Sequence, residues 1–189
     1  GDDIEYVIDI STRRADKGYT IGTDIASTLT SLQGDGTVFG KWNKGKNELS
    51  LSYDFNGYKR KGMRNEERAD YTLNDGNIYT ISRNDIATQR KQLGHDIKLT
   101  YNWMDSTACV FQASLSGSFY RTPGNYNIKD IYDGGNHYTA TSRESGNNSS
   151  PVADLYFFRQ LTPRQSITAN AVGTYISTKS SNYYDEGTP

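Results

Sequence analysis

Very few residues of this chain can support metal, redox or covalent chemistry. The 189 residues include one cysteine and two histidines. Cys109 cannot form an internal disulfide, and we interpret it as a small apolar residue of a strand. His95 and His137 lie far apart and lack the spacing of a metal site, so we assign them surface or loop roles.

Motifs of nucleotide binding and acid–base catalysis are absent as well. Neither a P-loop nor a G-x-G-x-x-G motif occurs. The acidic pair Glu66-Glu67 lies between Arg64 and Arg68 in a polar stretch, which we interpret as solvated loop. We therefore expect no enzymatic activity, no catalytic residue, no metal and no cofactor.

The charges nearly cancel, and no long hydrophobic run occurs. With 21 basic and 22 acidic residues the net charge is -1, so we expect no nucleic-acid partner. No stretch approaches the roughly 18 apolar residues of a membrane helix, and the first residues lack the features of a signal peptide. Only 34% of the residues are hydrophobic, yet 15 are tyrosine. This composition is too polar for a helical membrane protein and too aromatic for a disordered chain, and it favours an all-β fold.

The stretch from Asp96 to Tyr120 shows the strand pattern most clearly. Apolar and polar side chains alternate on both sides of a polar turn at Asp105 and Ser106. Because successive side chains leave a strand on opposite faces, this alternation predicts a hairpin with one apolar and one polar face. Each arm has roughly nine or more residues, the length that crosses a bilayer at a tilt.

The rest of the chain repeats this unit. Alternation predicts further strands at 4–10, 19–32, 37–42, 48–58, 151–160 and 166–177, with turns at 33–36, 44–46, 74–77, 133–136 and 161–165 and a flexible loop at 146–150. Since the short turns allow no parallel crossover, we predict an antiparallel up-and-down meander of about seven or eight strands with marginal helix.

Short turns alternate with long polar inserts, which we place at about 59–92 and 122–150. Transmembrane β-barrels have this asymmetry, with short turns at one rim and long outer loops at the other. Aromatic residues next to the turns and inserts suggest two girdles: Trp42, Trp103, Tyr58, Phe119 and Tyr120. The alternative is that these aromatics form the core of a soluble β protein.

Several segments resemble TonB-dependent receptors of the outer membrane. YVIDISTRR, ending at Arg14, is similar to the end of their plug domain. GYTIGTDIAS, KWNKGKNELSLSYDFNGY, LGHDIKLTYNWMD and SPVADLYFFRQLTPRQSITANAVGTYISTKS are similar to the first part of their barrel. The resemblance implies a plug-like segment at 1–14 and a partial transmembrane β-barrel at 15–189. We expect the chain to be a fragment of a longer protein.

The resemblance also implies a function and a location. The chain would form wall and outer loops of a receptor in a Gram-negative type of outer membrane that imports a nutrient of unknown identity. Outer-membrane lipid, the TonB complex acting through the missing part, a surface lipoprotein and the nutrient would be its partners. The alternative is a secreted or surface β-sandwich that binds carbohydrate or host protein through its loops. Unpaired edge strands and an apolar face predict self-association of the isolated chain.

Aromatic residues of the inserts are the candidate ligand-binding residues, because an aromatic face with a polar tip suits wet recognition. They are Tyr71, Tyr79, Tyr132 and Tyr138. Each could instead only stabilise a strand. Lys59-Arg60-Lys61 with Arg64 could meet the phosphates of lipopolysaccharide, or form a solvated loop.

Alternation also predicts which residues share a face. In the intact receptor we expect lipid to contact Leu51, Leu99, Leu115 and Ala169, and the lumen to be lined by Ser52, Thr100, Ser116 and Asn170.

Overall fold

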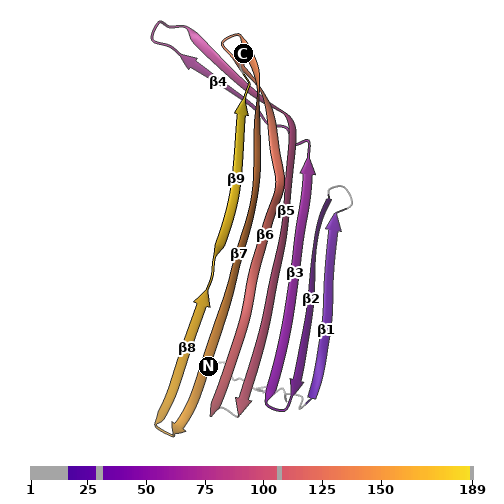
Figure 1. The fold of residues 1–189 in the computed structure, drawn as a ribbon, viewed down its shortest axis with the longest axis vertical. Helices are drawn as coiled ribbons and strands as arrows, with labels where there is room; N and C mark the ends of the chain where they lie inside the picture. Colours follow the sequence, from indigo (N-terminus) through magenta and orange to yellow (C-terminus); the bar gives the residue numbers. More distant parts are fainter. Residues whose placement is uncertain (1–16, 29–31, 106–107, 188–189) are drawn as a thin grey trace, which may run out of the picture.

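One antiparallel sheet contains all the strands of the computed structural model, which describes residues 17–28, 32–105 and 108–187. The strands are β1 (Lys17–Thr28), β2 (Leu32–Lys44), β3 (Asn47–Lys61), β4 (Glu66–Thr72), β5 (Ile78–Asp105), β6 (Cys109–Asp133), β7 (Asn136–Thr162), β8 (Gln165–Thr174) and β9 (Ser177–Glu186). Neighbours follow the order β1-β2-β3-β5-β6-β7-β8, while β4 pairs with β5 and β9 with β7 (Figure 1). The predicted all-β antiparallel meander is confirmed, with nine strands in the described residues where about seven or eight were expected. No helix able to cross a membrane is found in the described ranges.

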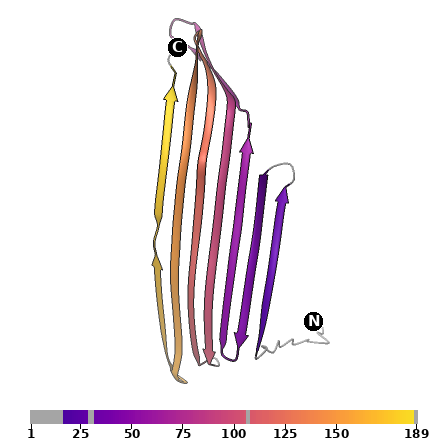
Figure 2. The same cartoon turned by 45° about the vertical axis from the view of Figure 1, so that its right-hand side comes forward.

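The middle strands are far longer than the others. β5, β6 and β7 have 28, 25 and 27 residues, against 12 in β1 and 13 in β2. Their upper ends rise beyond β1, β2 and β3 (Figure 2). We call the part above the end of β3 at Lys61 the upper extension. It contains β4, the upper ends of β5, β6 and β7, and the upper half of β9. Residues expected as long loops at 59–92 and 122–150 are therefore largely strands joined by tight turns, and the flexible loop predicted at 146–150 is wrong because these residues pair in β7.

β8 and β9 lie along the same edge of β7, one after the other. β8 pairs with Val152–Thr162 and β9 with Ala140–Ser149. Between them the ladder is interrupted at Tyr175 and Ile176, where the amide of Tyr175 donates to the carbonyl of Pro151 at 3.0 Å. The two strands thus continue one line, and β7 is paired on both sides over most of its length.

Several of the tight turns contain glycine with a left-handed backbone. Gly45 has a φ of 56° between β2 and β3, and Gly134 and Gly135 have φ of 56° and 99° between β6 and β7. Two successive positive φ values match the hairpin turn that suits twisted strands. The turn predicted at 33–36 is wrong: these residues belong to β2 and pair with Ile25–Thr28 of β1, because the cross-strand ladder keeps the glycines extended.

The sheet has almost no conventional core. Among the described hydrophobic residues only Ile131 and Ala140 are buried, at 5% and 4% exposure, and both lie in the upper extension. In the lower part, large apolar side chains such as Ile21, Leu51 and Leu115 remain exposed. Hydrogen bonding between strands, and not burial of apolar side chains away from water, organises the lower part of the sheet.

Gly45→Ala tests the turn at the lower end. We expect the folded protein to lose about 1 kcal/mol of unfolding free energy, because a Cβ disfavours the left-handed backbone. The matched control is Gly18→Ala, since Gly18 lies in β1 without a positive φ and a Cβ there meets nothing within 4 Å. Denaturant unfolding in detergent compares the two variants, and equal losses would contradict the assignment of this turn.

Candidate functional site

The two faces of the sheet have opposite chemistry, held in register across the strands. Leu51, Leu99, Leu115 and Ala153 are successive partners in one row, and Ala169 shares their face through its pairing with Phe157. Ser52, Thr100, Ser116 and Asn170 point to the other side, as predicted. We call these sides the apolar face and the hydrophilic face.

Five rows of the apolar face form a continuous band. From the lower end they contain Asn47, Trp103, Phe111 and Phe157; Leu49, Tyr101, Ala113 and Leu155; Leu51, Leu99, Leu115 and Ala153; Tyr53, Ile97, Gly117 and Pro151; and Phe55, His95, Phe119 and Ser149. The central row is aliphatic, and aromatic residues are concentrated in the rows toward both edges. β5 crosses this apolar band with residues 95–103, close to the roughly 9–11 residues of a tilted membrane-crossing strand.

The aromatic edges differ in part from the predicted girdles. Trp42 belongs to the lower edge through its pairing with Leu49, and Phe119 belongs to the upper edge. Tyr58 and Tyr120 lie on the hydrophilic face, because each is an odd number of residues along its strand from Phe55 or Phe119 of the band. Their position next to a turn or insert therefore predicted how far along the strands these residues lie, but not on which face of the sheet.

Exposure is reversed relative to a soluble sheet. In β3, Leu49, Leu51 and Tyr53 are exposed, whereas Ser50, Ser52 and Asp54 between them are half-buried. Leu115 in the middle of the sheet is 59% exposed. No described segment covers the band, and an apolar surface of this extent marks contact with lipid or another protein.

Polar side chains on the hydrophilic face form hydrogen bonds and ion pairs with one another across strands. Thr37 donates to Asp54 at 2.5 Å, and Asn102 donates to Glu48 at 3.2 Å. Glu48 also lies 3.0 Å from the ammonium of Lys41. This face carries mostly polar side chains, although Met104, Val110 and Phe158 form one apolar row near its lower end.

The four candidate tyrosines all lie in the upper extension, on both of its sides. Tyr71 and Tyr79 are cross-strand partners, and together with Tyr138 they lie on the continuation of the hydrophilic face. Tyr132 lies on the opposite side, where its ring stacks on His137 with centroids 4.5 Å apart. The structure thus groups three of the four on one face, while Tyr132 belongs to a separate pair.

A polar pocket of about 330 Å³ opens on the same face as Tyr138. It is lined by Glu67, Arg83, Asn127, Lys129, Ile131, Ala140, Ser142 and Tyr184. The ammonium of Lys129 lies 3.8 Å from Glu67 and 3.7 Å from the largely buried Asp85. The side-chain oxygen of Asn127 is buried without a hydrogen-bond donor. Such a pocket can bind a polar ligand that donates hydrogen bonds.

Sequence reasoning missed Arg83, Lys129 and Tyr184. The first two lie in a stretch without clear alternation, and Tyr184 reaches the pocket only because β9 pairs with β7. The only signal was the charged and aromatic composition of the inserts, which indicates recognition but not which residues meet.

Glu186 raises the pKa of both nearby tyrosines. Its hydrogen bond with Tyr138 is the main cause of the raised pKa of that phenol, because ionisation would place two negative charges together. Burial is the main cause for Tyr184, followed by the charge of Glu186, whose carboxylate accepts from the Tyr184 hydroxyl at 3.3 Å. The site therefore favours neutral tyrosines that can donate hydrogen bonds.

Similarity to known proteins does not assign this chain to a family. No family model and no curated protein matches the chain. Among the described residues, no group of three or more histidine, cysteine, aspartate or glutamate side chains could hold a metal ion.

Glu186→Gln should lower the pKa of Tyr138 and Tyr184. Because both values are raised in the folded protein, the stabilising contacts are fully present below about pH 10 and are lost as the pH rises through the folded pKa. Absorbance titration of tyrosine ionisation should show the latest-titrating phenols shifting to lower pH. Asp185→Asn is the control, since Asp185 points to the other side of β9; an equal shift there would contradict the assignment.

Proposed function

We propose that this chain forms part of the wall of an outer-membrane β-barrel of the TonB-dependent receptor type, which imports a nutrient. The observation that carries the proposal is the exposed apolar band, five residue rows high and aromatic toward both edges, opposite a hydrophilic face. Lipid-facing strands of such barrels have this arrangement, with an outward apolar band between aromatic girdles.

Strand pairing supports a barrel over a membrane-embedded open sheet. Every backbone polar group within a bilayer must be hydrogen-bonded, so a spanning sheet must close on itself. Within the described residues β1 and the β8–β9 line each lack a partner on one side. Further strands of a longer protein would close the barrel, and without them the isolated chain should self-associate through these edges and the band.

The two ends of the sheet support an orientation. At the lower end the turns near 45–46 and 163–164 are short, while the upper extension stands well beyond the band. Short turns face the periplasm and long segments the outside in this class of barrel. The upper extension is then extracellular, and its polar pocket is the candidate region for the nutrient.

The proposed partners follow from this placement. Outer-membrane lipid contacts the apolar band, and the upper extension is accessible to the nutrient and to a surface lipoprotein. Coupling to the TonB complex requires a plug, and the plug-like segment expected at 1–14 lies outside the described residues.

Site-directed labelling in native membranes tests the assignment of the faces. Cys109 is first replaced by alanine, and single cysteines are placed at Leu51, Leu99 and Leu115 of the full-length protein. We expect them to react with a lipid-phase probe and to resist an aqueous maleimide, because they face hydrocarbon. Cysteines at Ser52 and at the exposed Asn170, both on the hydrophilic face, serve as controls and should react from water.

Free aqueous labelling at the leucine positions would overturn the lipid-facing assignment. Protection of those positions from both probes would instead indicate a covered core, as in a β-sandwich that binds carbohydrate or host protein. Either result would remove the basis for a receptor barrel.

Charge insertion gives an independent test of the two faces. Leu115→Arg should cost about 2–4 kcal/mol of unfolding free energy in lipid vesicles, since it places a cation near the middle of the band. Ser114→Arg is the matched control, because Ser114 lies on the hydrophilic face opposite Asp154, which can pair with it. Chemical denaturation measures both, and a larger loss for Ser114→Arg would contradict the proposal.

A further inference from the structure

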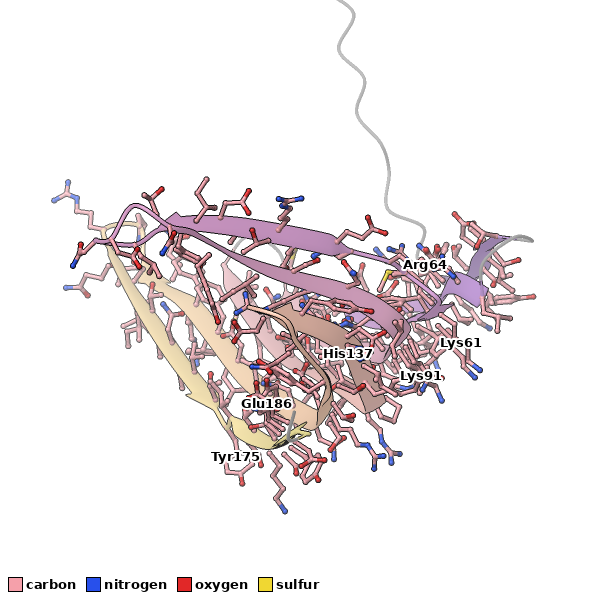
Figure 3. The ribbon with its side chains drawn as sticks, turned by 90° about the horizontal axis from the view of Figure 1, so that it is seen from above. Lys61, Arg64, Lys91, His137, Tyr175 and Glu186 are labelled. Atoms are coloured by element: carbon pink, nitrogen blue, oxygen red, sulfur yellow. The ribbon has the colours of Figure 1, made fainter. Side chains whose placement is uncertain are left out.

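A belt of cations lies directly above the apolar band, on the same face. Three residue rows there contain Lys59, Lys61, Lys91, Arg121, Arg143 and Lys179. No described carboxylate shares these rows on that face, and none of the six forms an ion pair with another described residue. In Figure 3, which views the sheet from above, Lys61 and Lys91 lie close together at the right, away from Tyr175 at the lower left. The belt therefore has unmatched positive charge.

Two members of this cation belt flank a polar pocket. Arg121 pairs with Asn147 and Asn147 with Lys179, so the three residues are neighbours across β6, β7 and β9. Two strand spacings separate the backbones of Arg121 and Lys179, about 10 Å, which both long side chains can bridge over Asn147. They line a pocket of about 340 Å³ together with small residues such as Ser145 and Ser181. Two cations above small polar groups suit an anionic phosphate.

An apolar hollow of about 710 Å³ lies immediately below this pocket. Small residues form its floor, because Gly117, Ala153 and Gly173 lie on three neighbouring strands. Phe119 and Tyr175 stand on either side near its upper end. Phe119 is two residues from Arg121 on the same face, so the hollow begins where the polar pocket ends.

We propose that this combination is a binding site for an anionic, phosphate-bearing lipid. Arg121 and Lys179 hold the headgroup, and an acyl chain lies in the hollow over Gly117, Ala153 and Gly173. Charge complementarity selects this occupant: a protein partner fitting the hollow alone would leave the cations unmatched, and a free phosphate would leave the hollow empty. The inference rests on the proposed membrane function, since the hollow meets acyl chains only if the apolar band faces lipid.

Fluorescence quenching by brominated lipids tests the site in the full-length protein. A bimane is attached to a cysteine at Leu155, which lies just below the hollow without lining it, in the Cys109→Ala background. The protein is reconstituted in phosphatidylcholine vesicles with increasing brominated phosphatidylglycerol or brominated phosphatidylcholine. We expect a preference of about five-fold or more for quenching by the anionic lipid, from the usual effect of basic residues at an anionic surface.

Two matched variants separate a built site from a general charge effect. Arg121→Gln with Lys179→Gln should bring the preference close to one. Lys59→Gln with Lys61→Gln removes two cations of the same belt away from the hollow and should leave most of the preference. Equal loss in both double variants, or no preference in the unchanged protein, would overturn the lipid site.

The remaining outcomes are also decisive. Loss of the preference on adding millimolar inorganic phosphate would show a phosphate site without a lipid requirement and overturn the proposal. Absence of quenching by either brominated lipid would mean that Leu155 does not face acyl chains, and the proposed function would fail with it. Strong quenching by both lipids without a preference would leave the membrane function standing and remove only the lipid site.

Discussion

In-register hydrogen bonding between neighbouring strands is the constraint on which the rest of this structure depends. A slip of one residue in any strand pair would move a leucine of the apolar band to the hydrophilic face. Leu51, Leu99 and Leu115 share a row only because both intervening ladders hold register. The irregularities between β5 and β6 occur above the band, at Asp85/Ala87 and at Gln89/Leu93. The rows of the band that β5 crosses with residues 95–103 therefore keep their register although the ladder above them is irregular.

The same register places the exposed apolar side chains on one face and the half-buried polar side chains on the other, which is the reverse of a water-soluble fold. In water, the exposed leucines of β3 would be a liability, since burying apolar surface is the main favourable term of folding. Here the stabilisation of the lower sheet comes from the ladders and from polar contacts such as Asn102 with Glu48. The apolar face is uncovered among the described residues. In the proposed function, hydrocarbon covers this face without a second protein layer.

Local sequence predicted the parts in which one face is apolar, because alternation is then visible. The hairpin at 96–120, the turns at 44–46, 74–77 and 133–136, and the sides of Leu115 and Ala169 follow from parity and turn chemistry alone. Alternation is lost where the few apolar residues lie on both faces, as Ile128 and Ile131 do, so 122–133 and 136–150 looked like loops although they are strands. Glycines at 34 and 36 resembled a turn, yet pairing with β1 holds them extended. The pocket depends on β9 meeting β7, a contact between distant segments that no local pattern encodes.

β7 runs through all three regions to which a function is proposed: the apolar band, the headgroup site and the upper pocket. Its lower residues Ala153 and Leu155 belong to the apolar band, Asn147 lies between the two cations of the proposed headgroup site, and Ala140 and Ser142 line the upper pocket. Paired with β6 on one side and with β8 and β9 on the other, it has few unsatisfied backbone groups along its length. The β8–β9 line is interrupted at Tyr175 and Ile176, beside the hollow that Tyr175 lines. Because β9 supplies both Lys179 and Tyr184, any shift of β9 at that break must alter the headgroup site and the upper pocket together.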